Sequence, residues 1–302
     1  MKEIRIGILG NVDSGKSTII SVLKEKILDN GRGLARRKIL KHKHEQDTGR
    51  TSSVTHHYYK DDKRIITFTD LAGHEKYYKT TMCGVNGSSL DYIILMVGSN
   101  MGVTRMTVEH LTLILITKIP FIIVFSKIDI CPEGIFNQSF NNIVKILKRY
   151  KIYKELQYIE NNSIAEENYN FQKKKVIPYF KVSNVKGDNI DILRQFILNI
   201  DPVYDWNTRK IEKQICIIED VFFVNGVGIV VTGTVKSGIL KKNDKLMLGP
   251  FNGIFYEVLI KSLHDNFKQV VEKIDAGYSG CFNIKSLDKK WSLKKKIIKR
   301  GM

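Results

Sequence analysis

The sequence predicts an α/β protein in which a mostly parallel, doubly wound sheet is followed by a small β-barrel. Up to about residue 201, short runs rich in Ile and Val alternate with segments of helical periodicity. The dipeptide Asp201-Pro202 ends this alternation. Beyond it, the apolar runs are short and divided by glycines, as in small antiparallel barrels. We therefore expect a first domain over residues 1–203 and a barrel domain over residues 204–302.

The strands expected in the first domain are apolar runs without alternation, which is typical of parallel strands buried on both faces. They fall at residues 4–9, 64–69, 92–97, 121–125 and 176–182. Helices are expected near residues 17–27, 75–84, 105–117, 137–149 and 188–199. Two stretches interrupt the pattern. Residues 29–50 are basic and irregular, and residues 151–175 are polar, so we expect the latter to be a long surface loop or a short insertion.

Composition places the chain among globular proteins, with 43% hydrophobic and 26% charged residues. No run of about eighteen apolar residues and no signal-peptide pattern is present, so we expect no contact with a membrane. Scattered cysteines without a CxxC pair favour a reduced, cytoplasmic compartment. The net charge of +18 favours a phosphate polymer as partner, although a coding bias toward Lys and Asn would produce the same excess.

Residues 10–17 match G-x-x-x-x-G-K-[ST], a phosphate-binding loop, and stand between an expected strand and an expected helix. The glycines let main-chain N–H groups turn toward an anion, and the helix N-terminus favours negative charge. Lys16 can reach the β- and γ-phosphates, and the Ser17 hydroxyl can ligate Mg²⁺. The residues expected to contact the nucleotide here are Gly10, Asn11, Asp13, Ser14, Gly15, Lys16, Ser17 and Thr18.

A second phosphate-side element is the sequence D-L-A-G-H at residues 70–74, directly after an expected strand. Asp70 stands where enzymes with such a loop hold Mg²⁺, usually through a water. Gly73 can bring its N–H to the γ-phosphate. His74 replaces the Gln of Ras-type GTPases, and an imidazole can orient the attacking water near neutral pH. We expect Lys16 and His74 to be the catalytic residues.

The strand at residues 121–125 runs into S-K-I-D, which resembles the N-K-x-D signature of guanine-specific GTPases. The Asp129 carboxylate can accept two N–H donors that guanine has and adenine lacks. The stem of Lys127 can lie along the base. Ser126 replaces the usual Asn, which removes a side-chain amide and is expected to loosen the local bracing of the loop without changing the choice of base.

A later turn, Ser183-Asn184-Val185, follows the strand at residues 176–182. It matches the position of the S-A-x loop, in which a main-chain N–H meets the guanine carbonyl. Taken in order with the preceding elements, this turn predicts GTP and GDP as the ligands.

The combined motifs resemble the elongation factor Tu-like translational GTPases, and among them the GTP-binding protein 1 and 2 group. They are G-N-V-D-S-G-K-S-T at the phosphate loop, the segment at residues 28–54, D-L-A-G-H-E-K-Y at 70–77, M-T-V-E-H-L at 106–111 and N-G-V-G-I-V-V-T-G-T at 225–234. The resemblance implies a barrel like the second domain of elongation factor Tu. Because the chain ends at Met302, we expect that barrel to be incomplete and a third domain to be absent.

The resemblance also implies residue roles. The Thr that ligates Mg²⁺ through the family's R-G-x-T switch motif corresponds to Ser53, with Thr51 as the fallback ligand. Asp13 matches an Asp linked to a monovalent cation beside the phosphates. No arginine finger is evident in the sequence, which implies slow unaided turnover and acceleration by a partner.

The function expected from these elements is a GTP-hydrolysing switch that acts with the ribosome and tRNA. One alternative is a GTP-controlled RNA-binding regulator of message turnover, and another is a nucleotide-binding decoy that does not hydrolyse. Two basic segments are either RNA contacts or solvated surface: residues 32–41, with several arginines, and residues 289–296, where Trp291 could stack on a base. The oligomeric state is not determined by the sequence.

Overall fold

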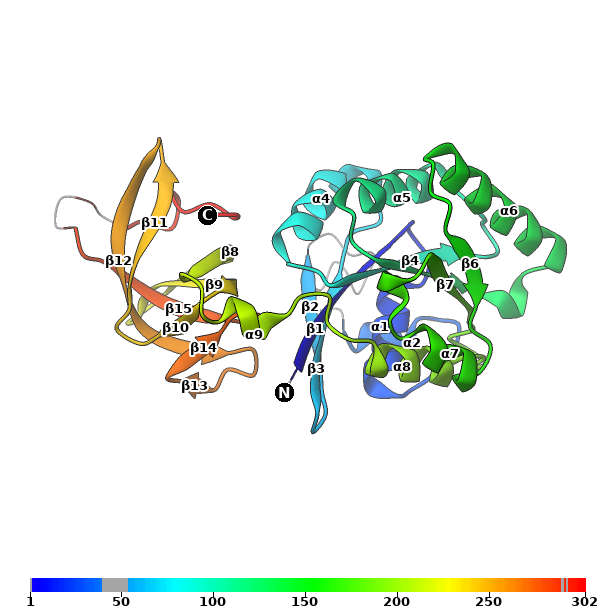
Figure 1. Ribbon diagram of the computed structural model, residues 1–302, viewed down its shortest axis with the longest axis horizontal. Helices are drawn as coiled ribbons and strands as arrows, with labels where there is room; N and C mark the ends of the chain where they lie inside the picture. The colour runs from blue at the N-terminus through cyan, green and yellow to red at the C-terminus, as the bar shows by residue number, and fades with distance from the viewer. Residues whose placement is uncertain (1, 40–53, 289–290, 292) are drawn as a thin grey trace. The chain divides into compact units, whose positions relative to one another are not determined.

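The computed structural model describes residues 2–39, 54–288, 291 and 293–302 (Figure 1). The chain forms two compact units, and each is described by itself. The first consists of Met1–Asn86 and Leu90–Val203, and the second of Gly87–Ser89 and Tyr204–Met302.

The first unit is built on a seven-stranded sheet with the order β2-β3-β1-β4-β5-β7-β6. All neighbouring strands run parallel except β2, which pairs antiparallel with β3. This confirms the predicted mostly parallel, doubly wound sheet. The strands are β1 (Lys2–Gly10), β2 (Thr55–Lys60), β3 (Arg64–Asp70), β4 (Tyr92–Gly98), β5 (Phe121–Ser126), β6 (Glu155–Tyr158) and β7 (Val176–Lys181).

Helices cover both faces of this sheet (Figure 1). One layer contains α1 (Lys16–Glu25), α2 (Leu34–Arg37), α7 (Asn162–Asn168) and α8 (Ile190–Asn199). The other contains α4 (Tyr78–Gly87), α5 (Arg105–Thr117) and α6 (Glu133–Arg149). Two short 3-10 helices, η1 (Glu75–Tyr77) and η2 (Ile128–Ile130), follow the carboxyl ends of β3 and β5.

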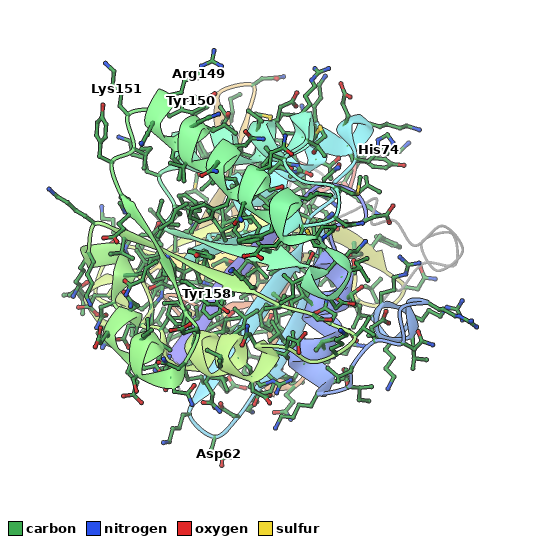
Figure 2. All side chains as sticks on the ribbon, turned by 90° about the vertical axis from the view of Figure 1, so that its right-hand side faces the viewer. Asp62, His74, Arg149, Tyr150, Lys151 and Tyr158 are labelled. Carbon is green, nitrogen blue, oxygen red and sulfur yellow. The ribbon has the colours of Figure 1, made fainter. Side chains whose placement is uncertain are left out.

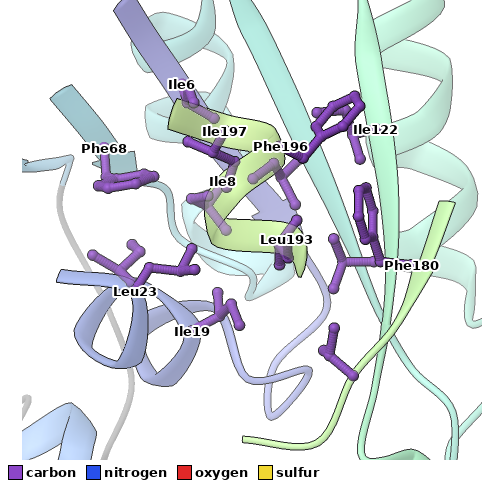
Figure 3. Close-up of a cluster of buried hydrophobic side chains, with 14 of the residues drawn as sticks. Ile6, Ile8, Ile19, Leu23, Phe68, Ile122, Phe180, Leu193, Phe196 and Ile197 are labelled. Atoms are coloured by element: carbon purple, nitrogen blue, oxygen red, sulfur yellow. The ribbon is translucent and has the colours of Figure 1, made fainter. Parts of the chain in front are cut away.

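A separate hydrophobic cluster joins each helical layer to the sheet. Ile6 and Ile8 of β1 belong to the cluster that also holds Leu193 of α8 (Figure 3). Leu95 of β4 belongs to the other cluster, together with Ile114 of α5. Successive strand residues point to opposite faces, so a central strand that is covered on both sides must be apolar throughout. Each such fully buried side chain contributes about 1.5–3 kcal/mol relative to exposure.

The expectation of a surface loop over residues 151–175 is wrong. The segment contains the edge strand β6, the helix α7 and the 3-10 helix η3 (Phe171–Lys173). An edge strand buries little side-chain area, and in β6 none of the four residues is fully buried, so no apolar run marks it. The Asn161 side chain accepts a 2.9 Å bond from the N–H of Ile164 and starts α7 within the polar stretch.

Strand β2 was not predicted for the same reason. It is an edge strand of sequence T-H-H-Y-Y-K in which only His57 is buried. Within the basic segment that begins at residue 29, the structure forms the short helix α2. The Asp29 carboxylate holds its start by accepting from the N–H groups of Gly31, Gly33 and Ala35.

The second unit is a curled antiparallel half-barrel, which confirms the predicted barrel fold. Its main sheet has the order β11-β12-β15-β9-β8, with β13 beside β12, and β10 pairs with β14. The elements are α9 (Trp206–Arg209), β8 (Ile215–Val224), β9 (Gly228–Ser237), β10 (Ile239–Lys241), β11 (Lys245–Phe251), β12 (Ile254–Asp265), β13 (Val270–Val271), β14 (Lys273–Asp275) and β15 (Ser279–Ser286).

A tight turn at Asn225-Gly226 joins β8 to β9, and Val224 pairs with Gly228 across it. Residues at the C-terminus extend the edge of β8. The N–H of Gly301 donates 2.8 Å to the carbonyl of Ile218, and the N–H of Ile218 donates 2.8 Å to the carbonyl of Met302. In the ranges described, the helices are too short or too polar to span a bilayer.

Candidate functional site

The loop between β1 and α1 turns through residues with positive φ. Gly10 has φ 155°, Asp13 has φ 59° and Gly15 has φ 87°. A Cβ on Gly10 would stand 2.5 Å from the main-chain oxygen of Met96, so no other residue fits there. Gly15 directly precedes α1, whose first N–H groups have no partner within the helix. The loop therefore has the geometry of an anion site at a helix N-terminus.

Lys16 is the buried cation of this loop. Its side chain is only 7% exposed, and its Nζ donates 2.8 Å to the main-chain carbonyl of Asn11. Burial lowers the pKa of Lys16 to about 8, although the nearby carboxylates of Asp70 and Asp13 oppose this shift. An ammonium that is costly to desolvate gains strongly from an anionic ligand, and a phosphate supplies one.

Ser17 and Asp70 lie together beside Lys16. The Ser17 Oγ donates 2.6 Å to Oδ2 of Asp70, which is 1% exposed at the carboxyl end of β3. A hydroxyl and a carboxylate oxygen this close are hard donors of the kind that Mg²⁺ prefers, and Mg²⁺ needs few protein ligands when phosphates supply the rest. These two residues therefore fit a magnesium ion.

Gly73 packs directly against the phosphate loop. A Cβ there would stand 2.5 Å from the main-chain oxygen of Gly10, and closer still to the Nζ of Lys16. His74, the next residue, begins η1, and its Nδ1 accepts a 3.1 Å bond from the N–H of Lys76. The structure thus brings the main chain of Gly73 to the loop, while the His74 imidazole caps its own helical turn.

The loop after β5 is joined to the phosphate loop through a buried hydroxyl. Ser126 is fully buried, and its Oγ donates 2.7 Å to the main-chain carbonyl of Ser14. The predicted loosening by this Ser is wrong in that respect, because the hydroxyl supplies a brace. Lys127 follows in a left-handed conformation with φ 59°, and Asp129 lies half-exposed in η2.

The turn at residues 183–185 also lies beside the phosphate loop. A Cβ on Gly15 would stand 3.4 Å from Nδ2 of Asn184, which places this side chain next to the loop. The Oγ of Ser183 accepts bonds of 3.3 Å from the N–H of Val185 and 3.0 Å from the N–H of Lys186. The fold therefore brings together three segments that are far apart in the sequence.

The remaining predicted residues differ in their placement. Asp13 is exposed on the loop, and Asn11 and Thr18 are half-buried there. Ser53 and the fallback ligand Thr51 lie outside the described residues. Trp291 does not present a free ring, since it stacks on Tyr256 with centroids 4.2 Å apart and planes 1° apart.

His110 of α5 was not predicted as a site residue. It is completely buried, and neither ring nitrogen has a hydrogen-bond partner in the part of the chain that the structure describes. Burial, with a smaller contribution from the positive charge of Lys16, lowers the pKa of His110 to about 4. A lone His within an apolar helical pattern gives no local sign of complete burial or of the influence of the Lys16 charge.

Comparisons with known proteins identify the family to which the chain belongs. Residues 1–211 match the elongation factor Tu GTP binding domain. GTP-binding protein 1 of Xenopus laevis is 37% identical over 99% of this chain and 49% of its own length. GTP-binding protein 2 of Homo sapiens is 32% identical over 99% of this chain and 53% of its own length.

A solved structure shares the fold over the whole chain. A bacterial selenocysteine-specific elongation factor superposes with a TM-score of 0.72 at 23% identity, covering 100% of this chain and 44% of that one. At this identity the match establishes the fold alone. The chain spans about half the length of the curated relatives that it matches.

Proposed function

Since the chain belongs to the family of the elongation factor Tu GTP binding domain, we propose that it hydrolyses GTP to GDP and phosphate and acts in the cytoplasm as a switch with the ribosome and tRNA. The observation that carries this proposal is the cluster of Lys16, Ser17, Asp70 and Gly73 around one glycine-rich loop. In this proposal the hydrolysing domain comprises residues 1–203, and the barrel of residues 204–302 moves with the state of the nucleotide.

Recognition of guanine is assigned to Asp129, with Lys127 alongside the base and the N–H groups of the 183–185 turn near the guanine carbonyl. Two observations support this assignment. The Ser126–Ser14 bond holds the base loop against the phosphate loop, and Asn184 lies beside Gly15. A base pocket and a phosphate loop joined in this way select one nucleotide as a unit, because a displaced base also misplaces its phosphates.

Hydrolysis proceeds by in-line attack of water on the γ-phosphorus, and the bond to the departing GDP oxygen breaks. The Lys16 ammonium and the N–H groups of the loop and of Gly73 neutralise the charge that develops on the phosphate oxygens. His74 orients the attacking water through its imidazole after this ring leaves the N–H of Lys76. Ser17 and Asp70, with Ser53 as the proposed third ligand, would hold Mg²⁺, which would supply further charge neutralisation when bound.

The proposal is tested by GTP turnover with and without ribosomes. The unaided rate is expected to be slow, and ribosomes should raise it by a factor that reaches about 10³–10⁵ in related systems. His74→Ala should remove the increase while leaving GDP affinity unchanged. Thr112→Ser on α5, which keeps the hydroxyl that bonds to Tyr150, is a control that should retain it. A stimulated rate that is equal in wild type and His74→Ala contradicts the role of His74.

A second candidate, a GTP-controlled RNA-binding regulator, is favoured by the charge of +18. It predicts that RNA affinity changes between GDP and a GTP analogue without ribosomes. Filter binding to tRNA and to messenger RNA fragments in both nucleotide states separates the two candidates. Phosphate release above that of Lys16→Ala excludes the non-hydrolysing decoy.

A further inference from the structure

The segments that lead into β5, β6 and β7 place exposed lysines on one edge of the sheet. These strands are parallel neighbours in the order β5-β7-β6, so their amino ends lie at the same edge. Lys118 precedes β5, Lys154 precedes β6 and Lys175 precedes β7. Adjacent strands are about 4.8 Å apart, so the three segments that lead into these strands lie within about 10 Å of one another along the edge.

Main-chain hydrogen bonds hold the segments before β6 and β7 in place. The N–H of Glu155 donates 2.9 Å to the carbonyl of Lys175, which joins the segments before β6 and β7. Lys151 follows the C-cap of α6 with φ 57°, and the N–H of Ile152 donates 2.9 Å back to the carbonyl of Leu147. A helix end of this kind is a defined turn. The main-chain positions of these residues are therefore set by the fold before any partner binds.

We define the amino-end surface as Lys118, Arg149, Lys151, Tyr153, Lys154 and Lys175, all of them exposed. Across the described residues, none of its cations forms an ion pair with a carboxylate. Five like charges that form no ion pair repel one another, and an anionic polymer relieves that repulsion by binding.

Tyr153 is an exposed aromatic ring within this surface. It is 77% exposed, and its ring makes no hydrogen bond or ring contact with another described residue. Its neighbour Tyr150 differs, since its hydroxyl lies 2.9 Å from Oγ1 of Thr112 on α5. An open aromatic face among cations is the arrangement on which an unpaired base stacks while its phosphates meet the lysines.

The amino-end surface lies apart from the phosphate loop. That loop follows the carboxyl end of β1, and the amino-end surface lies at the opposite ends of the strands. Figure 2 shows Arg149, Tyr150 and Lys151 together at one corner of the molecule, well separated from His74. A ligand here would therefore not compete with the nucleotide.

We propose that the amino-end surface binds single-stranded RNA, with phosphates on its lysines and one base stacked on Tyr153. A duplex hides the faces of its bases, and an acidic peptide has none, so neither uses Tyr153. The choice of RNA over DNA rests on the proposed function in translation; the location and the preference for single strands do not.

The test is fluorescence anisotropy of the full chain with a labelled 15-nucleotide RNA of mixed sequence, measured against salt with GDP and with a GTP analogue. Tyr153→Ala should weaken binding by about fivefold or more, and Tyr153→Trp should retain it. Lys154→Ala combined with Lys175→Ala should reduce the slope of log K against log salt by about 1.4, since each lost phosphate contact removes about 0.7. The matched control, Lys60→Ala with Lys63→Ala, removes two lysines at the turn that contains Asp62, which Figure 2 places far from Lys151.

Unchanged affinity in Tyr153→Ala overturns the proposal, as does an equal loss in the control pair. Equal or tighter binding of duplex RNA, of single-stranded DNA or of an oligoglutamate peptide overturns the assignment to single-stranded RNA. Lys16→Ala should keep its RNA affinity, because the phosphate loop takes no part. A failure of GTP hydrolysis and a failure of RNA binding are therefore separate results.

Discussion

The hydroxyl of Ser126 donates a 2.7 Å hydrogen bond to the main-chain carbonyl of Ser14. Both residues are buried, so this bond joins the loop that meets the base to the loop that meets the phosphates. In the relatives that carry N-K-x-D, an Asn stands at the position of Ser126. Here a shorter side chain provides the link, because the two loops approach closely enough for a hydroxyl to span them.

Ser126→Ala is expected to weaken GDP binding by about tenfold, since an unpaired buried carbonyl at Ser14 costs about 1–3 kcal/mol and loosens the phosphate loop. Titration with a fluorescent GDP analogue measures the effect. Ser139→Ala is the matched control, because its buried hydroxyl bonds to the carbonyl of Ile135 within its own helix, α6. Equal GDP affinities for Ser126→Ala and wild type would show that the bond does not organise the site.

GDP affinity is expected to fall as the pH rises above about 8. In the free protein the pKa of Lys16 is lowered to about 8, so the ammonium loses its proton there. Bound phosphate stabilises the charged form and raises the pKa, so binding above this pH takes up a proton. The dissociation constant should therefore increase with a slope approaching tenfold per pH unit. Isothermal titration calorimetry in buffers of different ionisation enthalpy measures the proton uptake, and its absence at pH 9 would refute the prediction.

Stability is expected to decrease on acidification because of His110. Its pKa is lowered to about 4 in the folded chain, whereas an unfolded His titrates near 6.5. Between these values the unfolded state binds the extra proton, so stability is lost as the pH falls from about 6.5 to 4, by up to about 3 kcal/mol.

His110→Phe should remove this acid sensitivity, since the ring that replaces the imidazole does not titrate. Urea unfolding at pH 5 and at pH 8 measures the difference for wild type and variant. At pH 8 the imidazole is neutral in both the folded and the unfolded state, so any stability difference between the two proteins there is not due to titration of His110. An identical pH dependence in wild type and His110→Phe would assign the loss to other groups.

Gly73→Ala is expected to reduce GTP hydrolysis by about tenfold or more. The added methyl would stand 2.5 Å from the carbonyl of Gly10 and would displace the Lys16 ammonium, which the transition state needs in place. Gly134→Ala in α6 is the matched control, because a Cβ there has no neighbour within 4 Å. Single-turnover phosphate release from bound GTP measures the effect, and a rate equal to that of the control would contradict the crowding argument.

Much of this protein was predictable from contiguous residues. In the phosphate loop, the D-x-x-G segment and the S-K-I-D segment, the functional residues lie within a few positions of one another, so each motif is recognisable locally. Central parallel strands must be apolar because both of their faces are covered, so they are also visible in the sequence. The edge strands β2 and β6 escaped prediction because an edge strand buries too little surface to require an apolar run.

By itself, the sequence determined the fold class, the nucleotide-binding elements and the family resemblance. Only the tertiary structure decided that the Ser126 hydroxyl bonds to the carbonyl of Ser14, that His110 is completely buried, and that the three lysine-bearing segments before β5, β6 and β7 share one edge of the sheet. These relationships depend on strand order. Strand order brings together residues far apart in the chain, and it results from the packing of the whole sheet rather than from any local pattern.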